Sequence, residues 1–364
     1  MKSDTDVFVI LTPGFPANEK DDTCLPFLQH LIKAINRDFT DVSIIILSFQ
    51  YPFRRQEYTW NYNTVISFGG KNRGKLQRRI IWIKVWRKLE RLRKKNNIKG
   101  LFSLWLGECA LLGKRFGEKH HITHLVWLLG QDAKRGNKYI ARMRPVARDL
   151  VAVSDFIANE FFTNYLIRPA GIITNGVDTT QFNQAPGARV IDVLGAGSLI
   201  SLKQYHIFVG IIKELKKKYS EVQSFIAGQG PGKDALQSLI TNLELDDNIS
   251  LPGEIAHGNL LGLMQRSKIF LHPSSYEGFS MVCQEALYSG CQVISFCKPM
   301  DDDIEHWHVV STREEMLEKA MQILESKNVD HKQVLPYRIE DTAASIMKLL
   351  YQSTFTNLVK TVSN

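Results

Sequence analysis

Short apolar runs alternate with longer amphipathic stretches along the chain, and this alternation predicts a parallel α/β protein. Residues 7–11 and 42–49 are apolar runs of the length expected for buried strands. Between them, apolar side chains recur at helical spacing over residues 28–35, after a start signal at Asp21 and with Pro26 in the first turn. Because a strand, a helix and a strand follow one another so closely, a parallel sheet is favoured.

The same alternation continues to the end of the chain in two sets, which are separated by a stretch of linker composition at residues 179–188. Helices are expected between the strands, and after Pro299 the pattern is helical. The further strands are expected at 101–106, 124–129, 150–153 and near 172 in the first set, and at 190–194, 222–227, 249–251, 268–271 and 292–295 in the second.

The length of 364 residues fits two domains of similar size. We expect a first Rossmann-like domain at residues 1–170 and a second at 188–335. The helices at 336–364 are expected to cross back onto the first domain. The predicted fold class is therefore α/β, with two parallel-sheet domains in one chain.

Two neighbouring segments of the first half depart from the simple alternation. Residues 51–74 mix aromatic and charged side chains without clear periodicity, and we predict a long, partly exposed loop there. Residues 75–95 form a basic helix with Trp82 and Trp86, which fits either attachment to an anionic membrane surface or a solvated helix beside the sheet. The apolar face of this helix is expected to contain five residues at helical spacing: Leu76, Ile80, Ile83, Leu89 and Leu92.

Composition and charge narrow the class of protein. Hydrophobic residues make up 44% and charged residues 23%, which excludes a disordered chain. The net charge of +9 favours an anionic partner, but no nucleic-acid-binding motif accompanies it, so we expect no nucleic acid. The five cysteines contain no C-x-x-C pair, and no apolar stretch approaches the ~20 residues that a membrane-spanning helix needs. A cytoplasmic protein with reduced thiols, soluble or peripheral at the membrane, is expected.

The segment from His272 to Gly290 contains the most informative chemistry. It follows the strand at 268–271, turns through polar residues that include Glu277, and enters a helix that contains Glu285. Ligands of such βαβ units bind beyond the carboxyl ends of the strands. Ser280 is a plausible N-cap, and the free amides of a helix N-terminus form an anion site. The two carboxylates fit either hydroxyl acceptors in a nucleotide-sugar site or a glycosidase acid/base pair, and the α/β context favours the first.

A second group of residues follows the first strand of the second half. Gly195-Ala-Gly197 ends that strand, and Lys203 stands in the next turn, within reach of the same edge of the sheet. A cation there would stabilise the negative charge that develops on a departing diphosphate. The histidines at 120, 121 and 124 have no carboxylate or thiolate at matching spacing, so no metal site is predicted, and the acidic run at 301–303 is interpreted as a solvated loop.

Four segments in this order resemble the retaining glycosyltransferases of family 4, which have the GT-B architecture of two Rossmann-like domains facing across a cleft. The resemblance covers about residues 172–297, whereas the first half is similar only in its overall plan. The segments are Asn-Gly-Val-Asp at 175–178, the Gly-x-Gly turn with Lys203, Ala-Gly-Gln-Gly-Pro at 227–231, and the E-x7-E stretch at 272–290.

The resemblance implies transfer of a sugar from a nucleotide-diphosphate sugar, UDP- or GDP-linked, to a hydroxyl of a glycan or lipid-linked acceptor. The anomeric configuration would be retained, and no metal or other cofactor would be required. The reaction would belong to the synthesis of a cell-surface polysaccharide or glycolipid. Lys203 would contact the diphosphate and Glu285 the ribose. The remaining donor-side positions would be Gly197, Ser198, Glu277 and the amides of Gly278, Phe279 and Ser280.

The sequence departs from the family pattern at several positions. Ser198 stands where the family usually has an arginine, so one charge against the phosphates is missing. The usual histidine near the reacting carbon is replaced by a turn containing Gln131 and Asp132, which places Asp132 with Glu277 and Lys203 in the predicted catalytic set. On the acceptor side we expect Gln131 with Gly14 and Phe15. The alternatives are a nucleotide-sugar epimerase or hydrolase on the same fold, and a non-catalytic relative that binds sugar nucleotides.

Overall fold

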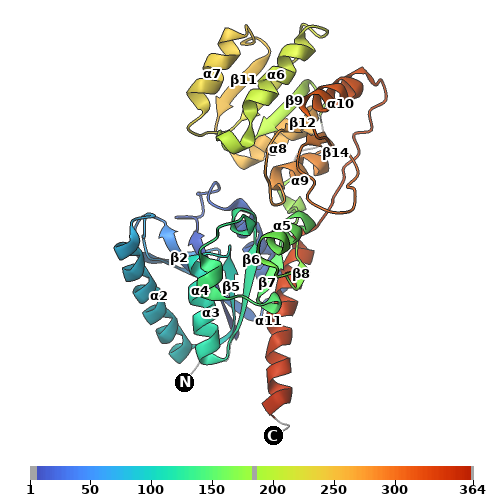
Figure 1. Cartoon of the computed structure of the whole chain (residues 1–364). Coiled ribbons are helices and arrows are strands. Elements are labelled where there is room, and N and C mark those ends of the chain that lie inside the picture. The colour runs from blue at the N-terminus through green and yellow to red at the C-terminus, as the bar shows by residue number, and fades with distance from the viewer. Residues whose placement is uncertain (1–5, 183–186, 362–364) are drawn as a thin grey trace. The chain divides into compact units, whose positions relative to one another are not determined.

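The computed structural model describes residues 6–182 and 187–361, with side chains as far as Tyr351. The chain divides into two compact units. The first unit contains Met1–Asn175 together with Ile339–Asn364, and the second contains Gly176–Arg338. Figure 1 shows both units, each built from a sheet covered by helices. The linker predicted at residues 179–188 lies partly outside the described residues, and its start forms a short 3-10 helix at Thr179–Gln181.

The sheet of the first unit has eight strands in the order β3-β4-β2-β1-β5-β6-β7-β8. Its central strand β1 (Asp6–Gly14) pairs in parallel with β2 (Val42–Tyr51) on one side and β5 (Asn97–Leu104) on the other. The order of the chain therefore reverses between β1 and β5. The sheet continues in parallel through β6 (Thr123–Leu128), β7 (Leu150–Ala152) and β8 (Gly171–Ile172).

The prediction of a long loop at residues 51–74 is wrong. Strands β3 (Gln56–Trp60) and β4 (Asn63–Ser67) form an antiparallel hairpin there, and β4 also pairs in parallel with β2. The hairpin turns at Asn61 and Tyr62, which both have positive φ. Trp60 packs edge-on against the buried Phe15 ring, with 5.0 Å between the ring centroids. Charged residues on the exposed outer strand hide this alternation in the sequence.

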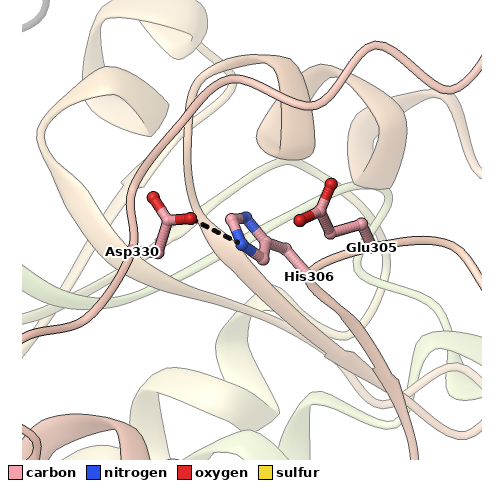
Figure 2. A group of neighbouring side chains, drawn as sticks. All are labelled: Glu305, His306 and Asp330. Carbon is pink, nitrogen blue, oxygen red and sulfur yellow. Dashed lines mark ion pairs between the residues drawn. The ribbon is translucent and has the colours of Figure 1, made fainter.

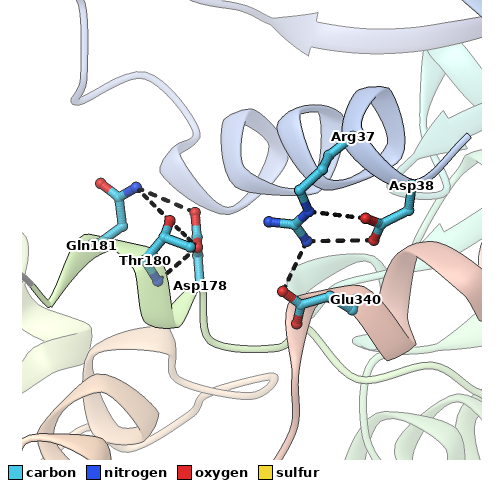
Figure 3. Close-up of polar contacts among 6 residues, drawn as sticks. All are labelled: Arg37, Asp38, Asp178, Thr180, Gln181 and Glu340. Atoms are coloured by element: carbon cyan, nitrogen blue, oxygen red, sulfur yellow. Dashed lines mark hydrogen bonds and ion pairs between the residues drawn. The ribbon is translucent and has the colours of Figure 1, made fainter. Parts of the chain in front are cut away.

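Helices cover both faces of the first sheet. Side chains of β1 alternate between the faces, so Val9 packs with α2 (Lys75–Lys95) and α3 (Glu108–His120), whereas Phe8 contacts Tyr351 of α11 (Ile339–Thr361). Helix α11 also packs on α1 (Pro26–Asp38), where Arg37 pairs with Glu340 at 2.8 Å (Figure 3). The remaining helices of this unit are α4 (Tyr139–Met143) and α5 (Asp155–Tyr165).

Helix α2 has its predicted boundaries, but the predicted apolar face was partly wrong. Leu89 and Leu92 are buried against the sheet as expected, together with Ile81 and Val85. The other three residues of the predicted apolar face are exposed, because they lie on the opposite side of the helix at 100° per residue. Their exposed fractions are 74% for Leu76, 44% for Ile80 and 52% for Ile83.

The second unit contains a six-stranded, wholly parallel sheet in the order β11-β10-β9-β12-β13-β14. Since β9 pairs with both β10 and β12, the chain order reverses between β9 and β12. Strand β14 (Trp307–Val309) was not predicted from the sequence. The other strands are β9 (Ile191–Ala196), β10 (Ser224–Ala227), β11 (Ile249–Gly253), β12 (Ser267–His272) and β13 (Gln292–Ser295).

Among the described residues of the second unit, five α-helices pack around its sheet, and the first two and the last of them form one core with the strands. They are α6 (Tyr205–Lys216), α7 (Lys233–Asn242), α8 (His257–Gln265), α9 (Met281–Tyr288) and α10 (Arg313–Glu325). Among the described helices of both units, none has the length and apolar character needed to cross a bilayer.

Candidate functional site

The predicted donor-site residues gather at the carboxyl ends of β9 and β12 in the second unit. These neighbouring strands flank the position where the chain order reverses, which is where parallel sheets bind ligands. The loops after the two strands are joined directly, because the amide and the hydroxyl of Ser275 both donate to the Leu202 carbonyl, at 3.0 and 3.2 Å. Lys203 and Glu277 are thereby brought to one place from positions far apart in the sequence.

Glycines allow the loops after β9 and β10 to approach closely. Gly228 has a φ of +157°, and a Cβ atom there would lie only 1.9 Å from the carbonyl oxygen of Gly197. The Gly197 amide donates to the Ala227 carbonyl at 2.9 Å, and its own φ is +145°. A side chain at Gly228 would therefore separate the two loops and displace the turn that carries Lys203.

Lys203, Glu277 and His272 form the polar centre of the site. The Lys203 Nζ atom lies 2.5 Å from Glu277 Oε2, and His272 Nε2 lies 3.3 Å from the same oxygen. His272 is the last residue of β12 and is buried, whereas Lys203 and Glu277 are partly exposed. The carboxylate is thus held in one orientation from two sides.

The surroundings of Glu277 keep it ionised. Burial would raise its pKa, but the hydrogen bond from His272 and the charge of Lys203 outweigh burial and lower the pKa to about 2. Burial also lowers the pKa of His272, so the imidazole is neutral at pH 7 and donates Nε2–H to the carboxylate. Since the folded pKa of Glu277 lies below its ordinary value of 4.5, the stability that it contributes is present above pH 4.5. That stability is lost as the pH falls towards 2.

The start of α9 differs in one detail from the expectation. Ser280 is the N-cap residue by position, but its side chain makes no capping hydrogen bond. Phe279 is buried and packs on the rings of Trp307 and Tyr337, at 5.8 and 5.5 Å, so its ring belongs to the core. This packing fixes the backbone of Gly278 and Phe279 at the positively polarised end of the helix.

Glu285 has a partner that the sequence did not reveal. Its side chain projects from α9 and is 5% exposed, and its Oε1 atom lies 2.9 Å from Nε2 of His257, the first residue of α8. His257 precedes Glu285 by 28 positions, and no local pattern connects the two. The histidine orients the carboxylate predicted to hold the ribose.

Tyr205 is a second polar group at this site that the sequence analysis missed. Its ring is buried under the Gly197 turn, and its hydroxyl has no hydrogen-bond partner among the described residues. A Cβ atom at Gly197 would lie 3.2 Å from this hydroxyl. Ser198, where the expected arginine is missing, is exposed on the same turn.

The Asn-Gly-Val-Asp segment at 175–178 has a structural explanation. The Asp178 side chain caps the following 3-10 helix, since its Oδ1 atom accepts hydrogen bonds from the Thr180 amide at 3.1 Å and hydroxyl at 2.6 Å (Figure 3). The Val177 amide donates to the Tyr337 carbonyl at 2.9 Å. The segment therefore fixes the start of the second unit beside its end.

In the first unit, Asp132 is fully engaged by the backbone. Its Oδ2 atom accepts from the Leu106 amide at 2.9 Å, and Oδ1 accepts from Leu129 at 3.2 Å and Gly130 at 2.9 Å. Burial is the largest influence on its pKa and raises it, against the lowering effect of these donors. The carboxylate ties the chain after β5 to the chain after β6, which is the arrangement of a positioning residue.

The other residues predicted for the first unit lie near the carboxyl edge of its sheet but differ in exposure. Gly14 ends β1, and Gln131 is exposed at the start of a 3-10 turn. The Phe15 side chain has no exposed surface, because it packs under Trp60, so it has nothing to offer an acceptor.

Glu108 is a further candidate at this edge that was not predicted. It begins α3 and is 12% exposed, and its carboxylate accepts hydrogen bonds from Gln50 of β2 and from Trp82 Nε1 of α2, the latter at 2.7 Å. Arg78 Nε lies 3.7 Å away. The negative charge sits favourably at the helix N-terminus, and the contacts join two helices to the end of β2.

One group of potential metal ligands occurs among the described residues: Glu305, His306 and Asp330 of the second unit (Figure 2). Their ligand atoms lie within 4.8 Å of one another. Both carboxylates already have cationic or imidazole neighbours, since Glu305 pairs with Lys332 at 2.6 Å and Asp330 Oδ2 lies 3.6 Å from His306 Nε2. These contacts account for the group without a bound ion.

The fold is that of the GT-B class, and solved structures with it align over nearly the whole chain. Sucrose-phosphate synthase from Thermosynechococcus elongatus is 12% identical, with a TM-score of 0.70, and covers 99% of this chain and 100% of its own. HepE from Anabaena, solved in complex with UDP and glucose, is 15% identical, with a TM-score of 0.65, and 99% of each chain is covered.

Residues 179–335, which make up less than half of the chain, match the model of the family described as glycosyl transferases group 1. One subunit of the human phosphatidylinositol N-acetylglucosaminyltransferase is 32% identical over 126 residues, which are 34% of this chain and 26% of that protein. The chain spans between 26% and 33% of the length of the first curated relatives that it matches.

Proposed function

We propose that the protein is a glycosyltransferase that moves a sugar from a nucleotide-diphosphate sugar to an acceptor hydroxyl. The observation that carries the proposal is the contact between Lys203 and Glu277, at 2.5 Å, beside the N-terminus of α9 at the reversal point of the second sheet. A cation and a helix N-terminus suit a diphosphate, and a fixed carboxylate suits sugar hydroxyls. The family match of residues 179–335 supports this assignment.

Each part of the donor has a partner in this proposal. Lys203 and the amides of Gly278, Phe279 and Ser280 receive the diphosphate, and the loop at Gly197 and Ser198 lies alongside it. Glu277 accepts hydrogen bonds from sugar hydroxyls, and Glu285, oriented by His257, accepts those of the ribose. When the donor binds, Lys203 loses part of its contact with Glu277 and contacts the phosphates of the donor instead.

Transfer is proposed to retain the anomeric configuration, by the metal-independent route that the resemblance implies. The bond between the anomeric carbon and the diphosphate oxygen breaks, and its electron pair leaves with the nucleotide diphosphate. The acceptor hydroxyl attacks the same face of the sugar and passes its proton to the leaving phosphate. Lys203 stabilises the negative charge that develops on the diphosphate.

A thermal-shift panel of nucleotide diphosphates and nucleotide sugars tests the proposed donor. A UDP- or GDP-linked sugar is expected to stabilise the protein selectively, because a ligand at 100 times its Kd adds about 2.7 kcal/mol. The UDP complex of the Anabaena relative makes uracil the first base to examine. The matched nucleoside monophosphates serve as controls, since they lack the second phosphate. No response to any donor would refute the proposal, and with the donor known, NMR of the product gives the anomeric configuration.

For the acceptor, we propose a glycan or lipid-linked molecule reached by the first unit at the cytoplasmic face of a membrane. Helix α2 exposes Leu76, Ile80 and Ile83 in its first half and basic residues along the rest of the same side. Apolar side chains with flanking cations are the pattern of a helix that lies on an anionic bilayer. The human relative is named for transfer to phosphatidylinositol, a membrane lipid.

Co-sedimentation with lipid vesicles tests this membrane contact. The protein is expected to pellet with phosphatidylcholine vesicles that contain phosphatidylglycerol, and less with phosphatidylcholine alone. A variant with the three substitutions Leu76→Ser, Ile80→Ser and Ile83→Ser should not pellet with vesicles, because each replacement removes apolar area from the bilayer contact. Leu166→Ser is the control, since Leu166 is 80% exposed but lies outside α2. Equal pelleting of both variants would contradict the proposed contact.

A further inference from the structure

A groove runs between α2 and the β3–β4 hairpin in the first unit, and the donor site of the second unit takes no part in it. Its volume is about 650 Å³, within the range of small-molecule sites. The floor includes Ser67 and Phe68, which are buried, at the end of β4. The walls come from the edge strand β3 and from one side of α2.

The walls of this groove are strongly cationic. Five cations and a single carboxylate line it, which leaves a local charge of +4 (five minus one). The carboxylate, Glu57, is paired with Lys88 at 2.8 Å. The other four cations are Arg55, Lys84, Arg87 and Arg91. None of the four forms an ion pair with a carboxylate in the part of the chain that the structure describes.

This concentration of positive charge in a concave site favours an anionic ligand. Like charges a few ångströms apart repel one another, and low-dielectric walls strengthen the field inside a groove. The nearest acid on the same helix, Glu90, does not compensate them, because its carboxylate already contacts Lys119, His120 and Arg93. The spacing of Lys84, Arg87 and Arg91 at i, i+3 and i+7 points these cations along one side of α2.

We propose that this groove is a binding site for phosphate groups that bear at least two negative charges, either a phosphomonoester or a pyrophosphate. Guanidinium groups match phosphate oxygens with paired N–H donors, and the three arginines therefore suit this ligand better than a carboxylate. The phosphate belongs either to a soluble molecule or to a lipid headgroup. Binding here requires neither sugar transfer nor an intact donor site.

Two variants with the same change in net charge test this groove. The first replaces Lys84, Arg87 and Arg91 by glutamine, and the matched control replaces Arg79, Lys94 and Lys95, which are exposed on α2 and do not line the groove. The full chain is titrated with inorganic pyrophosphate and glycerol 3-phosphate by calorimetry. Co-sedimentation then compares phosphatidylcholine vesicles with and without phosphatidic acid.

The groove variant is expected to bind the soluble phosphates at least about tenfold more weakly than the control variant, which should match the wild type in these titrations. Loss of binding to the soluble phosphates assigns the groove to a soluble ligand, and loss only on phosphatidic acid vesicles assigns it to a lipid headgroup. Equal weakening of the two variants, or no binding of any probe by the wild type, overturns the proposal. Thermal shifts with nucleotide sugars should be the same for both variants, which separates this outcome from failure of the proposed function.

Discussion

Replacing Glu277 by glutamine is expected to lower kcat/KM for sugar transfer by roughly 10²–10³-fold, the size seen when one preorganised group at a reacting centre is removed. Glutamine keeps the shape of the side chain but removes the charge that Lys203 and His272 hold in place at 2.5 and 3.3 Å. Lys203 then lacks its partner and no longer has a fixed position against the diphosphate. Initial rates at several donor concentrations measure the change.

The control for this prediction is Glu305→Gln in the same unit. Glu305 is exposed and contacts Lys332, away from β9 and β12, so its replacement should leave kcat/KM within about twofold. If Glu277→Gln transferred sugar as fast as this control, the assignment of the site would be wrong. Free sugar as the main product in the presence of acceptor would instead indicate a hydrolase.

A pH series separates loss of chemistry from loss of structure in the same variant. Ionised Glu277 stabilises the second unit above pH 4.5, and this contribution disappears as the pH falls towards 2. As the pH falls from 6 to below 4.5, the wild type should therefore lose more stability than Glu277→Gln, which has no carboxyl group to titrate at this position. A parallel decline of both proteins in urea unfolding experiments would show that the contact with Lys203 contributes no stability.

The donor site was the more predictable part of the molecule, for a physical reason. Strand, turn and helix are local features, and a parallel sheet brings the turns after neighbouring strands to one edge, so Lys203 and Glu277 could be placed together from their order alone. The partner of Glu285 could not be found in this way. His257 begins a different helix, and its distance from Glu285 depends on how α8 packs against α9. Tyr205 was missed because an aromatic residue at helical spacing predicts core equally well.

The first unit shows where sequence patterns become ambiguous. Two sets of apolar residues at helical spacing lie on opposite sides of α2, and only packing against the sheet decides that Val85 is buried and Ile83 exposed. The β3–β4 hairpin was hidden because an edge strand tolerates charged residues on its outer side. Both errors fall in the segment that forms the cationic groove, so the groove itself was not predictable.

Replacing Asp132 by alanine is expected to lower the free energy of unfolding of the first unit by about 3–5 kcal/mol. Three backbone N–H groups, two of them in buried contacts (Leu106 and Gly130) and one in a partly buried contact (Leu129), would lose their acceptor, and each unsatisfied buried donor costs about 1–3 kcal/mol. Asp132→Asn keeps one oxygen and should lose less. Urea unfolding followed by tryptophan fluorescence measures the difference, since Trp105 and Trp127 lie beside these loops.

The neighbouring change Gln131→Ala is the matched control, because Gln131 is exposed and should change stability by no more than about 0.5 kcal/mol. The pair of variants also decides between two roles for Asp132. If Asp132 only positions the loops, through its hydrogen bonds with three amides, the Asp132→Ala variant should first lose stability. Its activity should fall only as the loops after β5 and β6 separate. If Asp132→Ala were as stable as Gln131→Ala yet inactive, the carboxylate would act on the reacting groups directly, because the hydrogen bonds to the backbone would then be dispensable for folding.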